Sequence, residues 1–165
     1  MSATAVDPLL QELLDKQALH ELVIRYCRAV DRGDEELLRS VYWEDAIDDH
    51  GYHTGTREEF IAHMNATSWT AEQKQVRVQH SLTNETFEIH GDVAYGETYV
   101  EVRDSAGGEL AIRGVGRYVD RFERRDGEWR IAHRRVVPDW LTPGIDISVF
   151  PEPRRDRSDV SYLRD

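Results

Sequence analysis

Asp31 is an acidic residue at a position where the surrounding pattern calls for an apolar one. It ends the run Tyr26-Cys27-Arg28-Ala29-Val30-Asp31. Counting back by four and by seven residues gives Cys27 and Ile24, which predicts that Asp31 shares their inward-facing row on a helix. The helix macrodipole also disfavours a carboxylate at the C-terminal end. We therefore expect Asp31 to be a buried acid or base, with a carboxylate that bonds the amides of the following turn as the alternative.

His80 is the basic residue that could work with this acid. In the run that contains it, apolar and polar residues alternate, so that His80 shares a face with Val78, Leu82 and Asn84. A carboxylate that holds one imidazole nitrogen fixes the tautomer and makes the other nitrogen a better base near neutral pH. An Asp31–His80 pair would therefore remove a proton without a metal or cofactor. The spacing also allows a core histidine that is merely hydrogen-bonded.

The elements that must position these two residues follow from periodicity and turn signals. Apolar residues recur every three or four positions in the first part of the chain, and the period changes to two from Val76 onward. Helices followed by antiparallel hairpins predict an α+β fold with helices on one face of a curved sheet. We expect helices at 8–32, 35–42 and 57–67, a short strand at 46–48, and strands at 76–89, 93–103, 110–124 and 128–138.

Composition limits the class of protein. The 165 residues are 39% hydrophobic and 32% charged, with a net charge of −11, which is typical of one soluble domain and disfavours nucleic acid as a partner. The single cysteine, Cys27, excludes an intrachain disulfide. No signal peptide or membrane-spanning run is evident, so we expect a cytoplasmic protein that does not bind membranes. We assign residues 1–150 to the domain and residues 151–165 to a charged surface tail.

Several short motifs, taken in order, resemble the SnoaL-like family of the NTF2-like superfamily. They are Tyr26–Asp31, Asp34 at the start of the second helix, Asp45-Ala46, Arg77-Val78-Gln79-His80, and Arg124-Arg125-Asp126-Gly127-Glu128-Trp129. Scytalone dehydratases, hexachlorocyclohexane dehydrochlorinases and bile-acid dehydratases are the members that these motifs are similar to. The resemblance implies a cone-shaped α+β barrel with a deep pocket between the helices and the concave sheet. It also implies that Asp31 and His80 abstract a proton from the substrate.

Further catalytic residues are implied by the same resemblance. Tyr26 stands where bile-acid dehydratases keep a tyrosine, although five residues, about 140° of helix, separate it from Asp31. Arg134 matches an arginine of the dehydrochlorinases when counted from the final tryptophan of the hairpin. Strand alternation sets Arg134 opposite to Trp129, so which of Arg134 and Arg135 faces the pocket stays open.

Several residues are candidates for binding the substrate. His50 lies near the position of a tyrosine that polarises the substrate carbonyl in scytalone dehydratases, and it could donate a hydrogen bond to an oxyanion. Tyr118 stands where those enzymes have an asparagine. Trp43 and Trp140, together with Tyr42 and Trp69, could line an apolar pocket for a hydrophobic substrate, and core packing is the alternative for all of them.

The histidines and acids around His50 also have the chemistry of metal ligands. His50-x-x-His53, with Asp48, Asp49 and His63 nearby, could bind zinc or iron. A loop that contains glycine and acids is more often a solvated turn, and the family resemblance implies no metal. We predict neither a metal nor a cofactor.

The leading hypothesis is a cofactor-independent lyase or isomerase of the dehydratase kind, acting on a hydrophobic cyclic small molecule through the Asp31–His80 pair. The alternatives are a non-catalytic ligand-binding or assembly subunit of the same fold, and a polyketide-type cyclase. One face of an open curved sheet would be exposed in a monomer, so we also expect a homo-oligomer, either a trimer or a dimer.

Overall fold

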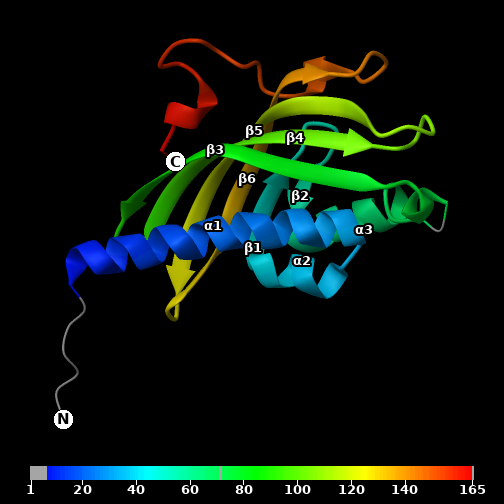
Figure 1. Cartoon of the computed structure of the whole chain (residues 1–165). Coiled ribbons are helices and arrows are strands. Elements are labelled where there is room, and N and C mark those ends of the chain that lie inside the picture. The colour runs from blue at the N-terminus through cyan, green and yellow to red at the C-terminus, as the bar shows by residue number, and fades with distance from the viewer. Residues whose placement is uncertain (1–6, 71, 165) are drawn as a thin grey trace.

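Three helices pack on a six-stranded mixed sheet in the computed structural model, which describes residues 7–70 and 72–164 (Figure 1). The predicted α+β class is confirmed. The helices are α1 (Pro8–Arg32), α2 (Glu35–Val41) and α3 (Arg57–Ala66), and the strands are β1 (Tyr42–Asp49), β2 (Thr54–Thr56), β3 (Val78–His90), β4 (Val93–Asp104), β5 (Ala111–Arg125) and β6 (Glu128–Leu141).

The sheet has the strand order β2-β1-β6-β5-β4-β3. The three predicted hairpins join β3 to β6 in antiparallel order, and β1 pairs with β6 in parallel. The prediction for β1 was too short, because this strand begins directly after α2, and β2 was missed altogether. Since β1 and β3 lie near opposite edges, residues at these two places come together only if the sheet curves.

Extra residues bend the sheet and reverse its alternation, and two of them affect the positions of the candidate residues. Asn84 has a φ of 42° and interrupts the pairing of β3 with β4, and Ala132 is an extra residue in β6 opposite β5. An inserted residue increases local twist and sends the next side chain to the other face. The predicted face for Asn84 is therefore wrong, and beyond Ala132 the inward row of β6 continues from Ile131 to Arg134.

The long helix α1 is limited at both ends by local signals. The Asp7 carboxylate accepts a hydrogen bond from the Leu9 amide at 2.8 Å, and Gly33 ends the helix in the left-handed conformation with φ 62°. Its buried face comprises Leu19, Leu22, Val23, Tyr26, Cys27 and Val30, among others. Ile24 is 44% exposed, so the prediction that it shares an inward row with Cys27 is wrong. Cys27 lies at the edge of the buried face, and Ile24 lies about 60° further around the helix, on the side away from Val23 and Tyr26.

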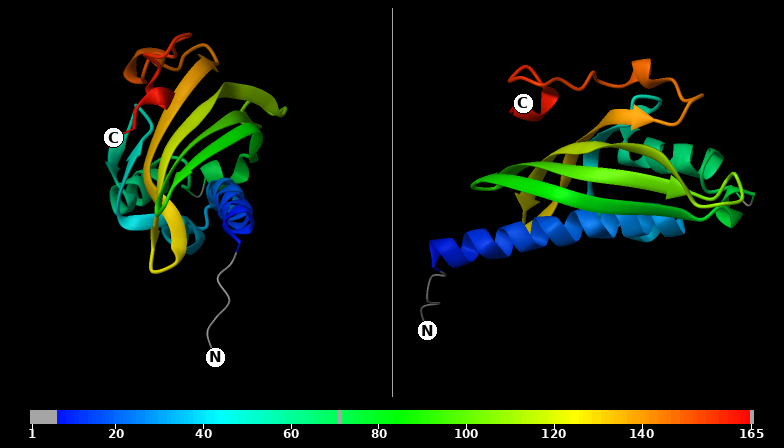
Figure 2. Two further views of the ribbon diagram at one scale, coloured as in Figure 1. Left: turned by 90° about the vertical axis from the view of Figure 1, so that its left-hand side faces the viewer. Right: turned by 45° about the horizontal axis from the view of Figure 1, so that its top comes forward.

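The first turns of α1 project beyond the sheet (Figures 1 and 2). Four leucines on these turns, Leu9, Leu10, Leu13 and Leu14, are between 50% and 73% exposed although their spacing predicted a buried stripe. Within residues 7–70 and 72–164, no part of the sheet covers these four leucines. No helix in that part of the chain is long and apolar enough to cross a membrane.

The C-terminal segment is docked on the side of the sheet that faces away from α1 (Figure 1). Arg117 on β5 donates two hydrogen bonds to Asp159, at 3.0 and 3.1 Å, and both side chains are buried. The Asp159 carboxylate also accepts a hydrogen bond from the Arg154 amide at 2.7 Å. The predicted surface tail is therefore held by a bidentate ion pair, which is the strong kind.

Replacing Asp159 by alanine should release this segment, because Arg117 would lose its bidentate partner. We expect trypsin to cleave after Arg154, Arg155 and Arg157 at least tenfold faster, since such cleavage follows the population of the open form. Mass spectrometry of timed digests measures the rate. Glu152→Ala, which removes an exposed carboxylate of the same segment, is the control. Equal cleavage of the Asp159→Ala variant and the unchanged chain would contradict this role.

Candidate active site

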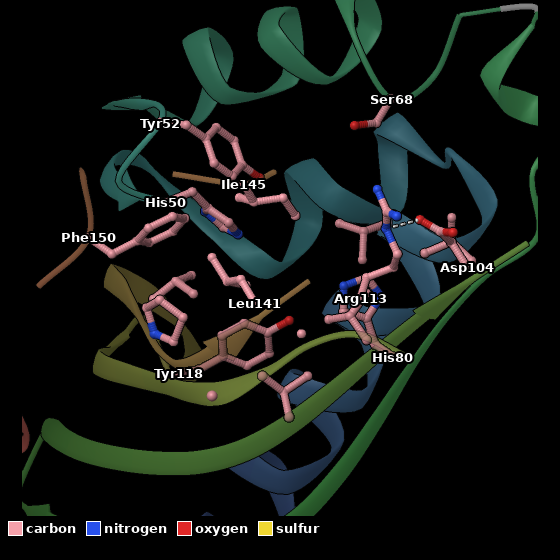
Figure 3. A pocket seen from close by; sticks show the side chains of 18 of the residues that line it. His50, Tyr52, Ser68, His80, Asp104, Arg113, Tyr118, Leu141, Ile145 and Phe150 are labelled. Carbon is pink, nitrogen blue, oxygen red and sulfur yellow. Dashed lines mark ion pairs between the residues drawn. The ribbon is translucent and has the colours of Figure 1, made fainter. Parts of the chain in front are cut away.

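A cavity of about 290 Å³ opens between the helices and the concave face of the sheet. Most of its lining is apolar and includes Val30, Phe60, Trp69, Val100, Val136 and Leu141. The polar groups that reach it include Tyr26, His50, Tyr52, His80 and Tyr118. Figure 3 shows His50 and His80 entering from different sides of the cavity. An engineered cavity of about 150 Å³ accommodates benzene, so this one has room for a molecule of one or two rings.

His80 and Asp31 form a hydrogen-bonded pair at the wall of the cavity. His80 Nδ1 lies 2.6 Å from Asp31 Oδ1, and the His80 backbone amide donates to Asp31 Oδ2 at 3.2 Å. The side chains of His80 and Asp31 are only 14% and 11% exposed. Because an ionised carboxylate only accepts, Nδ1 carries the proton and Nε2 keeps a free lone pair. His80 lines the cavity, whereas Asp31 lies behind it.

The end of α1 brings this carboxylate to β3. Helix α1 lies along that strand, and the Trp69 indole nitrogen donates to the Val30 carbonyl at 3.1 Å, next to the helix end. That bond satisfies one of the carbonyls that every helix C-terminus leaves without an intrahelical partner. Asp31 therefore has a fixed place, although the helix dipole there does not favour its charge.

A second histidine–carboxylate pair lies where β1 ends. His50 Nδ1 is hydrogen-bonded to Asp48 Oδ1, and the Tyr42 hydroxyl donates to Asp48 Oδ2 at 2.5 Å. The Tyr26 hydroxyl lies 3.2 Å from the other ring nitrogen, His50 Nε2. Asp48 is fully buried, so both of its oxygens depend on these protein donors. Four side chains thus form one hydrogen-bonded chain that ends at the cavity.

A buried ion pair, Arg134–Asp120, lies beneath the cavity. Arg134 is 0% exposed and donates to the two Asp120 oxygens at 2.8 and 2.6 Å. Its guanidinium carbon lies 3.9 Å from the centre of the Tyr26 ring and 4.1 Å from that of Tyr118. The cation thus lies against two rings that line the cavity, within the distance of a cation–π contact to each.

Tyr26 and Tyr118, two of the tyrosines that line the cavity, are hydrogen-bond donors rather than bases. Burial raises the pKa of Tyr26 well above the ordinary 10.0, and the charge of Asp48 raises it further. Burial is also the main cause of the raised pKa of Tyr118. Both hydroxyls therefore keep their protons across the physiological range.

Comparison with known proteins places this architecture in a family. Residues 11–135 match the SnoaL-like domain, which is most of the chain. The chain belongs to the SnoaL-like family. A gamma-hexachlorocyclohexane dehydrochlorinase from Sphingobium indicum is 27% identical over 150 residues, covering 86% of this chain and 92% of that protein.

Solved structures agree with this family and show the fold. An NTF2-like protein with a cystatin-like fold from Novosphingobium aromaticivorans is 25% identical, with a TM-score of 0.70 over 82% of this chain and 87% of that one. A second protein from that organism, provisionally assigned as a scytalone dehydratase, has a TM-score of 0.73 over 88% of this chain and 97% of that one. At 17% identity, the second likeness shows the fold alone. The predicted resemblance and fold class are confirmed.

The prediction that Arg134 or Arg135 faces the pocket is wrong. Arg134 does not line the cavity but supports Tyr26 and Tyr118 from beneath, because the extra residue Ala132 turns it inward. Arg135 points to the other side and donates to Asp49 at 3.3 Å. Neither guanidinium is among the groups that line the cavity.

The prediction that Trp43 and Trp140 line the pocket is wrong. The Trp43 indole donates to the Glu123 carbonyl at 3.0 Å, and its ring stacks under the guanidinium of Arg130. Trp140 is 46% exposed and lies outside the cavity. Alternation alone cannot say which end of a curved strand reaches the concave face. Trp69, the third tryptophan that the sequence offered for the pocket, is the one in the lining.

Two carboxylates that matter here, Asp48 and Asp120, were missed as partners of the site. Each stands two residues from a candidate, Asp48 before His50 and Asp120 after Tyr118. Side chains two apart share a face of a strand, so this spacing was the signal that could have found them. The histidines and acids considered as metal ligands are placed differently from a metal site: across residues 7–70 and 72–164, no three His, Cys, Asp or Glu side chains are arranged to hold an ion.

Replacing Asp120 by asparagine should destabilise the fold by about 3–5 kcal/mol, because it leaves the buried guanidinium of Arg134 without a counter-charge. Urea unfolding followed by circular dichroism measures the change in the free energy of unfolding. Asp45→Asn is the matched control, since the Asp45–Arg125 pair is exposed and should contribute less than about 1 kcal/mol. Equal losses of unfolding free energy in the two variants would show that the buried pair stabilises the fold no more than the exposed pair does.

Proposed function

We propose that this protein is a cofactor-independent lyase of the dehydratase kind that acts on a hydrophobic, cyclic, carbonyl-bearing small molecule. The observation that carries the proposal is the Asp31–His80 pair, with Nδ1 and Oδ1 2.6 Å apart and the imidazole at the wall of a cavity. This is the distance at which a carboxylate orients a histidine that acts as a general base.

In the proposed reaction His80 Nε2 takes a proton from the carbon next to the substrate carbonyl. The bonding electrons of that carbon form the new double bond as a group leaves the neighbouring carbon. His80 becomes an imidazolium, and the Asp31 carboxylate stabilises its charge without taking the proton. The low exposure of both side chains strengthens that electrostatic interaction.

The cavity supports a substrate that is small and mainly apolar. Valine, leucine and aromatic side chains make up most of its lining, and the polar groups converge from a few positions. Such a combination is typical of sites that orient one small molecule. The name of the dehydrochlorinase relative, an enzyme that eliminates rather than hydrolyses or oxidises, supports the same class of reaction.

The open cavity argues against the alternative of a purely structural assembly subunit. Side chains of the described residues leave about 290 Å³ unfilled beside His80, whereas a subunit without a ligand would pack that space. A cyclase would use the same base but needs an elongated pocket. We propose elimination because the cavity fits a compact ring. The predicted homo-oligomer stays a prediction.

Replacing His80 by alanine should lower kcat/KM for elimination by about 10²–10⁴-fold, the usual contribution of a general base. Suitable probes are 3-hydroxycyclohexanone and 3-acetoxycyclohexanone, which both yield cyclohex-2-enone, a product measured by its ultraviolet absorbance. In both probes the proton is removed from C2, between the carbonyl and the carbon that bears the leaving group, and the probes differ only in that leaving group.

His90→Ala is the matched control, because His90 lies on the same strand, is exposed and is not part of the cavity lining. We expect it to keep full activity. The proposed function is wrong if the unchanged protein accelerates neither probe, or if His80→Ala retains the activity of the unchanged protein.

A further inference from the structure

A second proton-transfer group faces the cavity from near the opposite edge of the sheet. We propose that His50, positioned by Asp48, passes a proton through the Tyr26 hydroxyl to an oxygen of the substrate. The cavity would then hold a base, His80, on one wall and an acid on another. This inference rests on the proposed function and adds the acid that elimination of water requires.

The direction of proton transfer follows from the hydrogen bonds of Asp48. Its two oxygens accept from Tyr42 and from His50 Nδ1, so the only nitrogen of His50 left to exchange a proton is Nε2. That atom lies 3.2 Å from the Tyr26 hydroxyl, within hydrogen-bonding distance. The Asp48 carboxylate accepts from Nδ1, so His50 can donate from Nε2 once that nitrogen also carries a proton.

Tyr26 suits the role of a relay and not that of a lone acid. Burial and the charge of Asp48 raise the pKa of Tyr26 well above its ordinary value, so its tyrosinate would be unstable. The hydroxyl can therefore give a proton to the substrate only if it receives one in the same step. His50 Nε2 is the donor within reach. The ring of Tyr26 is held in place by the Arg134 guanidinium beneath it.

The complete step balances in atoms and charge. His80 Nε2 takes the proton from the carbon next to the carbonyl, and that electron pair becomes the new carbon–carbon double bond. The carbon–oxygen bond breaks, and its electron pair takes the proton of the Tyr26 hydroxyl, so that water leaves. Tyr26 regains a proton from His50 Nε2. The enzyme ends with one histidine charged, as it began, and exchange with solvent returns the proton from His80 to His50.

The nature of the leaving group decides whether such an acid is needed. Water has a pKa of about 15.7, so hydroxide is a poor leaving group and must be protonated as it departs. Acetate or chloride leaves as a stable anion. A chain with a built acid opposite its base is therefore suited to substrates that lose a hydroxyl group, namely cyclic β-hydroxy ketones.

Comparing two leaving groups tests this inference with the purified full-length chain. For 3-hydroxycyclohexanone, His50→Gln and Tyr26→Phe should each lower kcat/KM by about 10²–10⁴-fold, the usual contribution of an acid. For 3-acetoxycyclohexanone the same variants should lose less than about tenfold, because no acid is required. Tyr26→Phe keeps the ring over Arg134, so it serves as a second variant should His50→Gln fold poorly.

Asp48 is the positioning residue in this arrangement, and Asp48→Asn tests it. An asparagine keeps the size of the side chain but removes the charge and can turn its amide toward Nδ1, which stabilises the wrong tautomer of His50. We expect the loss for the hydroxy probe to exceed the loss for the acetoxy probe, as for His50→Gln. Two-dimensional ¹⁵N spectra of the histidines, recorded where His50 is neutral, should show its single proton on Nδ1 in the unchanged chain and on Nε2 in the variant.

His53→Gln is the matched control, since His53 lies three residues along the same loop and is not part of the cavity lining. It should leave both rates unchanged. If the variants of His50 and Tyr26 slow both probes by the same factor, the relay is wrong while the proposed function stands. If the unchanged chain accelerates neither probe, the proposed function itself fails.

Discussion

The buried guanidinium of Arg134 is the constraint on which the site depends. A full positive charge inside the core requires a full negative charge beside it, and Asp120 supplies it from the neighbouring strand. The guanidinium then lies against the rings of both Tyr26 and Tyr118. These rings form part of the cavity wall, so the ion pair fixes from beneath the hydroxyls that a substrate would meet.

Topology brings the two histidines to one cavity. β3, which carries His80, is an edge strand of the sheet, and His50 follows β1, next to the other edge. Curvature from the inserted residues Asn84 and Ala132 turns these distant edges toward a common space. Each histidine has its own carboxylate, from the end of α1 for His80 and from β1 for His50. Each imidazole is therefore positioned independently of the other, as a base and an acid on different walls of one cavity must be.

Much of this arrangement was predictable from the sequence because it rests on simple periods. The break from a period near four to a period of two located the helices and hairpins, and it put Asp31 and His80 on inward faces. Strict alternation fails after an inserted residue, which is why Arg134 was left undecided and Asn84 was set on the wrong face. The sequence also does not show how far along α1 the sheet extends. The leucines at the start of α1 have the spacing of a buried stripe but extend past the sheet that would bury them.

Abstraction of a proton from carbon by His80 is the central claim, and deuterium exchange into cyclohexanone tests it most directly. This ketone has the acidic position but no leaving group, so exchange in heavy water reports proton removal alone. Proton NMR should show saturable, protein-dependent loss of the signal from the carbons next to the carbonyl, and His80→Gln should abolish it. Exchange at the rate of the buffer, or equal exchange with and without the His80 imidazole, would contradict the account.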